Sequence, residues 1–558
     1  MRSLTLTPLL LASACALPEI HIEKRDKHNN GATNYFRRAI PGRLDKRQST
    51  VETNIFNVLS WSSGGAYYAN ITVGTPPQPQ TVILDTGSSD LYFDASSAQT
   101  CQLPEDNPNT CRGGTYDSSS SNTYKEVSAA PAFNTSFGDG STAVGPYGSD
   151  VVGVGDVLVQ PVQFGVANEV NSTTGYSIGL LGLGYSANEA VTSIENTYQN
   201  LPEVLKDAGI INSRLYSIYL NDERATSGSI LFGGIDKSKY TGELATMNLL
   251  PPVYSGQVDG LIYQFITTIT AANVTANGQT TNLWEGGSTD INAYSSDDTA
   301  LPVLLDTGST AFQIPQSYYA EYIAPAFPFV NSQGLCSCKY ATSDYYLSLE
   351  FGNKVNIRVD ASEFIVAYVD PETRRTQSDS NGEVCVFLIQ PGQRSSRGFY
   401  IAGDAVLRSI YAVFDLDNGQ VSIAQAKVNN TDAPDVVTVA AGPTGVAAAV
   451  SSGVETAAPN TWSIAPEVAT STLSYAVSTA GSTIGTATGN AAVPTIAQVE
   501  GAGSGGSGGG SGGSNTGSGS SSSSSAAAAG IVHGADFTGF WITSVWVACI
   551  GLGAALMM

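Results

Sequence analysis

One short pattern occurs twice in this chain and limits its fold more than any other feature of the sequence. Residues 82–88 read VILDTGS and residues 303–309 read VLLDTGS, so in each copy an apolar run leads into Asp-Thr-Gly-Ser. The two aspartates, Asp85 and Asp306, stand 221 residues apart, which is about the length of one domain. We interpret the repeat as an internal duplication, in which two similar lobes each carry one aspartate from the end of a strand into a glycine turn.

An acid at the end of a buried strand needs a chemical reason, because ionised carboxylates are rarely buried unless they are paired or hydrogen-bonded. If the two turns face each other, the two carboxylates cannot both ionise cheaply, so they share a proton. One can then act as a base toward water while the other acts as an acid toward a carbonyl oxygen. Asp85 and Asp306 are therefore the candidate catalytic pair; the alternative is that both copies are only structural turns.

The histidine content excludes several other kinds of catalysis. His21, His28 and His533 are the three histidines of the chain, and all lie in terminal segments that we expect to be removed. A mature chain without histidine cannot use a Ser-His-Asp or Cys-His mechanism or build a histidine-ligated zinc site. No Cys-x-x-Cys pattern indicates a metal, and we expect no cofactor. The formal net charge of −23 argues against nucleic acid or an anionic lipid surface as a partner.

The N-terminus is typical of a secreted, processed protein. Residues 1–16 form an expected signal peptide, with an arginine before an apolar run and a small-x-small cleavage site at its end. Residues 17–47 carry three dibasic pairs and no core-like periodicity, which predicts a propeptide removed by cleavage after Arg47. The alternative is a solvated basic arm.

The C-terminus departs from globular composition. Residues 429–525 are expected to form a linker, rich in Ser, Thr and Ala at first and nearly pure Gly and Ser from 501. Residues 526–558 end in an apolar tail with no basic residue after it, which is the layout of a GPI-anchor signal that is removed. Ser525 is the expected attachment residue, with Ser524 as the neighbouring choice. The alternative is a tail-anchored transmembrane helix.

Cysteines and glycosylation sequons fit an oxidising, extracellular compartment. Once the two terminal cysteines are removed with their segments, five remain, and the closely spaced Cys101 and Cys111 are expected to form a disulfide. Cys385 would pair with Cys336 or Cys338, leaving one thiol over; Cys338 is our working assignment. The sequons predict glycosylation at Asn70, Asn134, Asn171, Asn273 and Asn429.

Beyond the repeat, the chain from Tyr67 to Ala426 resembles the pepsin-family aspartic endopeptidases, and more narrowly their fungal GPI-anchored, yapsin-like branch. The opening YYANITVGTPPQPQTVILDTGSSDLYF, the crossing segment SIGLLGLGY (177–185) and the segment FYIAGDAVLRSIYAVFDLDNGQVSIA carry this resemblance. It implies an all-β, two-lobed fold with a central substrate cleft and a flap hairpin, over residues 48–428. The N-lobe would span about 60–235 and the C-lobe about 236–428. Many short strand-like runs bounded by Gly, Pro, Asn and Ser agree with all-β structure.

The resemblance also implies roles for the residues around each aspartate. Thr86 and Thr307 would link the two turns through hydroxyl and backbone hydrogen bonds. Ser88 and Ser309 would orient the carboxylates, whereas Gly87 and Gly308 would let backbone amides approach them. For the threonines and serines, a plain turn-forming role is the alternative.

The expected flap departs from the family pattern. In FNTSFGDGSTAVG (133–145), Phe137 replaces the family's tyrosine at the hairpin tip, and Tyr92 replaces a tryptophan after the first Asp-Thr-Gly. We expect Phe137 and Tyr92 to pack together without the family's hydrogen bond. Gly138 and Asp139 would present backbone and a carboxylate to the substrate, although Asp139 could equally be a turn residue.

Taken together, the sequence predicts a secreted, propeptide-activated, GPI-anchored aspartic endopeptidase at the plasma membrane or cell wall. It would act at acidic pH on extended peptides, as a monomer, through an activated water and without a covalent intermediate. The resemblance implies cleavage near Lys or Arg, for which the acidic pairs at 105–106 and 297–298 are candidate subsites, or merely solvated loop residues. The alternatives are a catalytically silent binding protein on the same scaffold and a carboxylate-pair glycosidase.

Overall fold

The computed structural model describes residues 50–58, 66–104, 107, 110–127, 132–172, 177–191, 196–225, 228–295, 300–368, 376–380, 382–468 and 474–479. All of them belong to one unit of the chain, Pro41–Met558. The signal peptide, the propeptide, the GPI signal with Ser525, and both acidic pairs lie outside the described residues. Among the described residues, no helix is long and apolar enough to cross a membrane.

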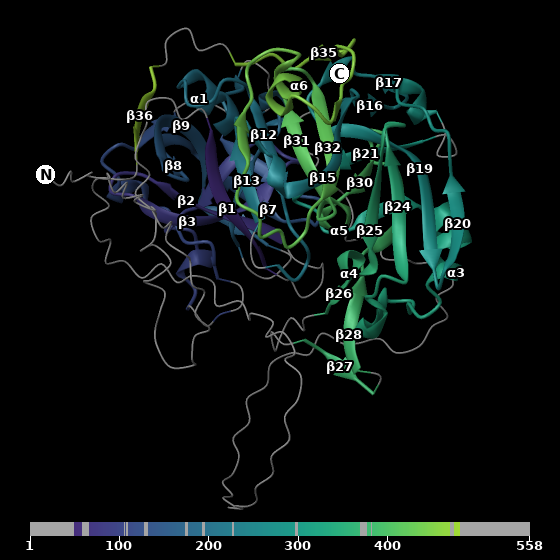
Figure 1. The fold of residues 1–558 in the computed structure, drawn as a ribbon. Coiled ribbons are helices and arrows are strands. Elements are labelled where there is room, and N and C mark those ends of the chain that lie inside the picture. Colours follow the sequence, from purple (N-terminus) through teal and green to yellow (C-terminus); the bar gives the residue numbers. More distant parts are fainter. Residues whose placement is uncertain are drawn as a thin grey trace, which may run out of the picture. The chain divides into compact units, whose positions relative to one another are not determined.

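Strands dominate, as expected for an all-β protein, and the longest sheet joins the two halves of the chain (Figure 1). Its strands are β1 (Val51–Val58), β2 (Ala66–Val73), β3 (Gln78–Asp85), β4 (Leu91–Asp94), β5 (Lys125–Val127), β8 (Tyr147–Val154), β9 (Val157–Ala167), β11 (Gly179–Gly182), β12 (Leu215–Tyr219), β13 (Gly228–Phe232), β15 (Tyr240–Asn248), β31 (Ile410–Asp415), β32 (Gln420–Ala426), β34 (Val454–Glu455) and β36 (Ala476–Thr479).

The C-terminal half contributes its own sheet and several smaller ones. The second large sheet consists of β19 (Ile266–Ala276), β20 (Gln279–Trp284), β21 (Leu301–Leu305), β22 (Phe312–Pro315), β24 (Tyr345–Phe351), β25 (Val355–Asp360), β29 (Ile389–Gly392) and β30 (Tyr400–Ala402). The smaller sheets are β23 (Leu335–Ser337), β28 (Gly382–Phe387), β26 (Ile365–Ala367) and β27 (Ser378–Asp379); β6 (Phe133–Ser136), β7 (Thr142–Gly145) and β10 (Glu169–Asn171); and the pairs β14 (Gly234–Asp236) with β33 (Val436–Thr438), β16 (Val253–Tyr254) with β17 (Gln257–Val258), and β18 (Leu261–Ile262) with β35 (Ser463–Ile464).

Helices are short in this strand framework. They are α1 (Leu201–Asp207), α2 (Gln316–Tyr318), α3 (Ala324–Ala326), α4 (Ala361–Phe364), α5 (Asp404–Leu407) and α6 (Gly445–Val450). Every residue of one of them, α5, is buried. Asn200 precedes α1 as its N-cap residue, and its side chain accepts a hydrogen bond from the amide of Glu203.

The duplication read from the sequence is confirmed by strand pairing. In the N-lobe, β11 runs parallel to β3 and antiparallel to β4. In the C-lobe, β30 runs parallel to β21 and antiparallel to β22 in the same relation. Both β11 and β30 are wholly buried. β12 pairs antiparallel with β31, so the lobes share one continuous sheet, and the two-lobed pepsin-like fold is confirmed.

The segment after residue 428 differs from the expected linker. Residues 429–468 and 474–479, which we call the C-terminal strap, pack on the domain (Figure 1). Each of its four strands pairs with a strand of the domain: β33 with β14, β34 with β15, β35 with β18, and β36 with β9. The low-complexity composition predicted a linker, but small apolar side chains of the strap pack against a sheet formed by other segments. The rest of the predicted linker, residues 480–525, lies outside the described residues.

The strap is held by buried valines and by charge. Val439, Val446 and Val450 are buried in a cluster with side chains of β12, β15, β31 and β32. Farther along, Glu467 forms ion pairs with Arg214 (Nε to Oε1, 3.2 Å) and with Lys206 of α1. The strap thus touches both the sheet that joins the lobes and the N-lobe.

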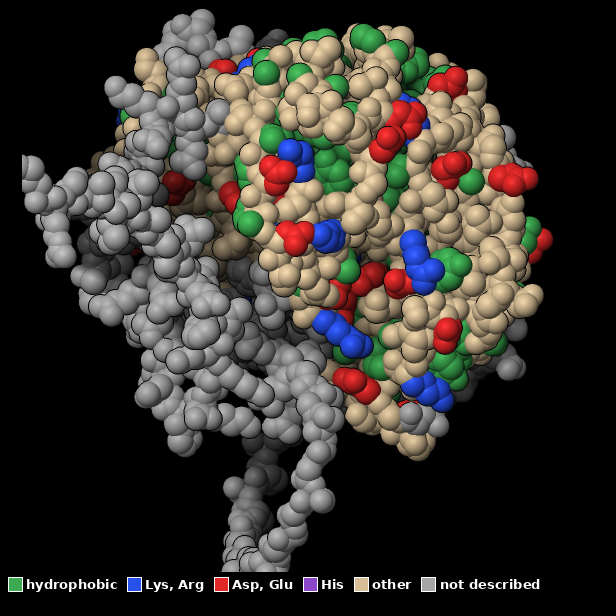
Figure 2. All heavy atoms as spheres, in the orientation of Figure 1, with side chains coloured by type: hydrophobic (Ala, Val, Ile, Leu, Met, Phe, Trp, Pro, Cys, Tyr) green, Lys and Arg blue, Asp and Glu red, His purple; other side chains and the backbone are tan. Residues whose placement is uncertain are grey.

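The cysteines and sequons take positions that fit an extracellular protein. Cys101 is bonded to Cys111 and Cys338 to Cys385, which leaves Cys336 as a buried free thiol. Asn273 is half-buried in β19, whereas the other four sequon asparagines are exposed. On the face shown in Figure 2, Lys and Arg side chains lie scattered among acidic and neutral ones.

Candidate active site

The two Asp-Thr-Gly turns meet where the lobes join. Asp85 is the last residue of β3, and its carbonyl accepts from the amide of Leu183 (2.9 Å), just beyond β11. Asp306 follows β21, and its amide donates to the carbonyl of Ala402 in β30 (3.1 Å). Each aspartate is thus fixed at the end of a buried strand by the strand that crosses behind it, and both side chains are buried.

Glycine is required in both turns because each faces the aspartate of the other lobe. The Gly87 amide donates to Oδ1 of Asp85 (2.7 Å), and the Gly308 amide donates to Oδ1 of Asp306 (2.9 Å). A Cβ atom on Gly87 would lie 2.6 Å from Oδ1 of Asp306, and one on Gly308 would lie 2.5 Å from Oδ1 of Asp85. No side chain fits at either position, so the two carboxylates can approach each other only over bare backbone.

The threonines tie the two turns together with near two-fold symmetry. The Thr86 hydroxyl donates to the carbonyl of Leu305 (2.8 Å) and accepts from the amide of Thr307 (3.0 Å). Reciprocally, the Thr307 hydroxyl donates to the carbonyl of Leu84 (2.8 Å) and accepts from the amide of Thr86 (3.1 Å). Four buried hydrogen bonds therefore fix the position of one aspartate relative to the other.

Burial raises the pKa values of both carboxyl groups, and the neighbouring charge of Asp85 raises that of Asp306 further. Burial raises the pKa of Asp85, and hydrogen bonds from the Ser88 hydroxyl and the Gly87 amide lower it again. The pKa of Asp306 lies well above its usual range, because burial and the neighbouring Asp85 both raise it while Gly308 and Ser309 oppose them only weakly. The shared proton is therefore favoured on Asp306, and the negative charge on Asp85.

A third acid, which sequence reasoning missed, lies behind the pair. Asp404, at the start of α5, is buried, and its amide donates to the carbonyl of Ser309 (2.8 Å). Burial raises its pKa well above the usual range, Arg408 lowers it, and both Asp306 and Asp85 raise it. The only available signal was its place within the FYIAGDAVLR segment.

The flap is formed by β6, β7 and the turn between them. The rings of Phe137 and Tyr92 lie 6.2 Å apart, centroid to centroid, and the Tyr92 hydroxyl donates to the carbonyl of Ile178 (3.4 Å). Gly138 and Asp139 form the turn, where the Asp139 carboxylate accepts from the amide and the hydroxyl of Ser141 (2.8 and 2.7 Å). Asp139 therefore stabilises the turn through Ser141, and its role toward a substrate stays a prediction.

A pocket opens between the Asp-Thr-Gly turn of the N-lobe and the flap. Ser88 and Asp90 line it from the turn side, and Phe137 lines it from the flap. Its remaining lining residues are Thr135, Ser136, Asn188 and Ala190. Of these, sequence reasoning singled out only Ser88 and Phe137, because no motif marks the loop that contains Asn188.

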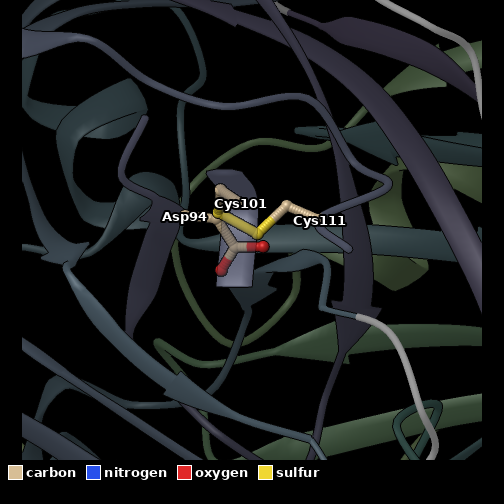
Figure 3. A group of neighbouring side chains, drawn as sticks. All are labelled: Asp94, Cys101 and Cys111. Carbon is tan, nitrogen blue, oxygen red and sulfur yellow. A yellow bond between two sulfur atoms is a disulfide. The ribbon is translucent and has the colours of Figure 1, made fainter. Parts of the chain in front are cut away.

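One group of potential metal ligands lies apart from the two turns. Asp94, Cys101 and Cys111 are neighbours, but Figure 3 shows the two sulfurs bonded to each other. Disulfide sulfurs are not the thiolates that metals require, so this group does not form a metal site. The Asp94 carboxylate accepts instead from the Ser177 hydroxyl (2.9 Å), and burial raises its pKa to about 7.

Comparison with known proteins agrees with this geometry. A family model described as "Eukaryotic aspartyl protease" matches residues 66–426. A probable aspartic-type endopeptidase opsB of Aspergillus fumigatus is 33% identical over 409 residues, which is 72% of this chain and 76% of the relative. Secreted aspartic protease 8 of Candida albicans is 34% identical over 385 residues (68% of this chain, 80% of the relative). An acid protease of Saccharomycopsis fibuligera is 34% identical over 365 residues (65% and 81%).

The match covers most of the chain, and both Asp-Thr-Gly turns lie within it. This chain belongs to the eukaryotic aspartyl protease family.

Proposed function

We propose that the protein is an endopeptidase in which Asp85 and Asp306 hydrolyse peptide bonds at acidic pH. The observation that carries this proposal is the approach of the two carboxylates over glycine backbone, linked by the reciprocal threonine hydrogen bonds. Such a pair holds one proton in common, which is the state that acid–base catalysis by two carboxyl groups needs.

The reaction uses a water molecule held between the two carboxyl groups. Asp85, as carboxylate, takes a proton from the water while the water oxygen attacks the carbonyl carbon of the peptide, and Asp306 gives its proton to the carbonyl oxygen. The tetrahedral intermediate then collapses: the amide nitrogen is protonated by Asp85, the C–N bond breaks, and Asp306 regains a proton from a hydroxyl. Thr86 and Thr307 position the turns, and Ser88 and Ser309 orient the carboxylates.

The site supports an extended peptide as substrate. The flap hairpin and the pocket beside Ser88 lie on the same side of the N-lobe turn, so a chain crossing the two aspartates would also contact Phe137 and Gly138. Phe137 and Tyr92 pack by their rings, and we expect this pair to set how the flap closes. In the yapsin-like reading, cleavage occurs beside Lys or Arg, consistent with the acidic composition.

Location and processing follow from the termini. We propose that the chain is secreted, activated by removal of residues 17–47, glycosylated at the sequon asparagines and held at the cell surface by a GPI anchor on Ser525. The name of the Candida albicans relative, which calls it secreted, supports the first step. We expect a monomer.

A second candidate function is a catalytically silent peptide-binding or cell-wall protein on the same scaffold. The altered flap, with Phe137 and Tyr92, is the observation that favours it. The intact pair of Asp-Thr-Gly turns favours the enzyme.

The test is a cleavage-site profile of the protein, produced from the full-length chain, on a mixed peptide library at pH 4 and pH 6. An Asp85→Asn variant is the control. Cleavage beside Lys or Arg that the variant lacks supports both the enzyme and its preference, whereas cleavage between apolar residues keeps the enzyme and discards the preference. A folded protein that cleaves nothing at either pH, and that also fails to bind a hydroxyl-containing mimic of the tetrahedral intermediate, contradicts the proposal.

A further inference from the structure

A polar contact joins the lobes outside the two catalytic turns. Arg397 lies in the C-lobe loop between β29 and β30, and its Nη1 donates to Oδ1 of Asn188 in the N-lobe (2.9 Å). In turn, Nδ2 of Asn188 donates to the carbonyl of Gly87, inside the first Asp-Thr-Gly turn (3.2 Å). A positive charge of one lobe is thereby linked, through one amide side chain, to the catalytic turn of the other.

The Arg397 side chain is buried between the C-lobe loop and two tyrosine rings. Arg397 is only 7% exposed, and its guanidinium lies 5.6 Å from the ring centroid of Tyr254 and 5.7 Å from that of Tyr263. Gly398 allows the tight turn, with a φ of +87°, and a Cβ there would lie 2.8 Å from the ring of Tyr294. Burying a charged guanidinium costs desolvation free energy that an exposed arginine does not incur. Arg397 is therefore not an ordinary surface arginine.

The contact reaches the Asp85 carboxylate through the backbone. The carbonyl of Gly87 and the amide of Ser88 belong to one peptide group, the Gly87–Ser88 peptide. The amides of Gly87 and Ser88 both donate hydrogen bonds to Asp85. A donor on a peptide carbonyl polarises that peptide and strengthens the hydrogen bond of its amide. Asn188 therefore acts on the same peptide that stabilises the Asp85 charge.

We propose that Arg397 and Asn188 are positioning residues for catalysis, which hold the Gly87–Ser88 peptide in its orientation toward Asp85 across the lobe interface. This inference rests on the proposed function, because it takes Asp85 to be the base of the reaction. Neither residue touches the reacting atoms, so each acts through the turn.

Two consequences distinguish this role from a merely structural one. Loss of the link should lower kcat about tenfold with KM changed less than about twofold, because a misoriented turn weakens the transition state more than substrate binding. It should also move the acidic limb of the kcat/KM profile to higher pH by about 0.5 unit, less than the effect of a direct ion pair. The other groups facing Asp85, which are Asp306, Asp404 and Tyr216, are unchanged by the substitution.

Arg394 provides a matched control. It lies three residues before Arg397 in the same loop, but its Nη1 and Nη2 donate to the carbonyls of Tyr294 and Ala293, within the C-lobe (2.9 and 3.3 Å). The experiment compares Arg397→Gln with Arg394→Gln, each made in the full-length chain, by kcat, KM and pH profile on one peptide substrate. Arg397→Lys keeps the charge and should restore the pH profile while recovering only part of kcat.

The expected result is a lower kcat and a shifted acidic limb for Arg397→Gln alone. Equal profiles for Arg397→Gln and Arg394→Gln would overturn the inference while leaving the proposed function intact. Inactivity of the parent protein, with Asp85→Asn no different from it, would mark the failure of the proposed function instead. If Arg397→Gln does not fold, Asn188→Leu decides: it adds no charge and keeps a similar volume, but it loses both the acceptor for Arg397 and the donor to Gly87, and an unchanged pH profile would refute the inference.

Discussion

The C-terminal strap offers a prediction that separates folded structure from linker. Val439 and Val436 lie three residues apart in it, yet Val439 is 1% exposed and Val436 is 39% exposed. Val439→Ala removes two buried methyl groups, worth about 0.8 kcal/mol each in transfer, and leaves a cavity, so the expected loss of unfolding free energy is about 2 kcal/mol. Val436→Ala should cost about 0.5 kcal/mol.

Thermal unfolding of both variants measures this difference. For a folded unit of roughly 400 residues, the entropy of unfolding converts 2 kcal/mol into a fall of about 2–3 °C in the midpoint, against about 0.6 °C for the control. Both substitutions are made in an Asp85→Asn background, so that self-digestion does not distort the melting curves. Equal midpoints for the two variants would refute the argument that the strap belongs to the folded domain, because a linker gains nothing from burying one valine rather than the other.

Three further predictions concern the rest of the molecule. Thr86→Val removes the hydroxyl that donates to the carbonyl of Leu305 and accepts from the amide of Thr307, and it leaves both of these buried groups unpaired. The free energy of unfolding, measured by chemical denaturation, should therefore fall by about 2–4 kcal/mol. Burial raises the pKa values of Asp94 and Glu203 to about 7, so between about pH 4 and pH 7 the native protein binds more protons than the unfolded chain. The thermal midpoint should therefore fall as the pH rises through this range. In Asp94→Asn this fall should be smaller. The Cys336 thiol, whose pKa burial raises to about 12, should react with a maleimide only after unfolding, and labelling of the native protein at neutral pH would contradict its burial.

The repeat predicted the fold and the central pair of the site because its signal is local. An apolar strand, a carboxylate and a glycine stand side by side in the sequence at both Asp85 and Asp306, and the chemistry of shared protons gives the reason to bring two such turns together. The disulfides followed similarly, since Cys101 and Cys111 are near in sequence. The choice between Cys336 and Cys338 needed the structure, because the two are only two residues apart: Cys336 lies opposite Cys385 in the strand pair β23–β28, whereas Cys338, just after β23, is bonded to it.

The remaining features depend on contacts between distant residues. Arg397 and Asn188 are 209 positions apart, and neither stands in a recognisable motif. The strap has the composition of a linker, and only its packing on a sheet made by other segments distinguishes its first part from the Gly/Ser run that follows. Asp404 was visible as a residue, but its place behind the two aspartates depends on how β30 crosses the C-lobe turn.

In the proposed mechanism two carboxyl groups, one from each lobe, are both needed for hydrolysis. The most direct measurement is the rate of cleavage of one peptide at acidic pH by the parent protein, Asp85→Asn and Asp306→Asn, with folding of each checked by its thermal midpoint. Each single substitution should lower kcat at least about a thousandfold while the protein stays folded. Substantial activity in either folded variant would contradict this mechanism, because one carboxyl group would then suffice.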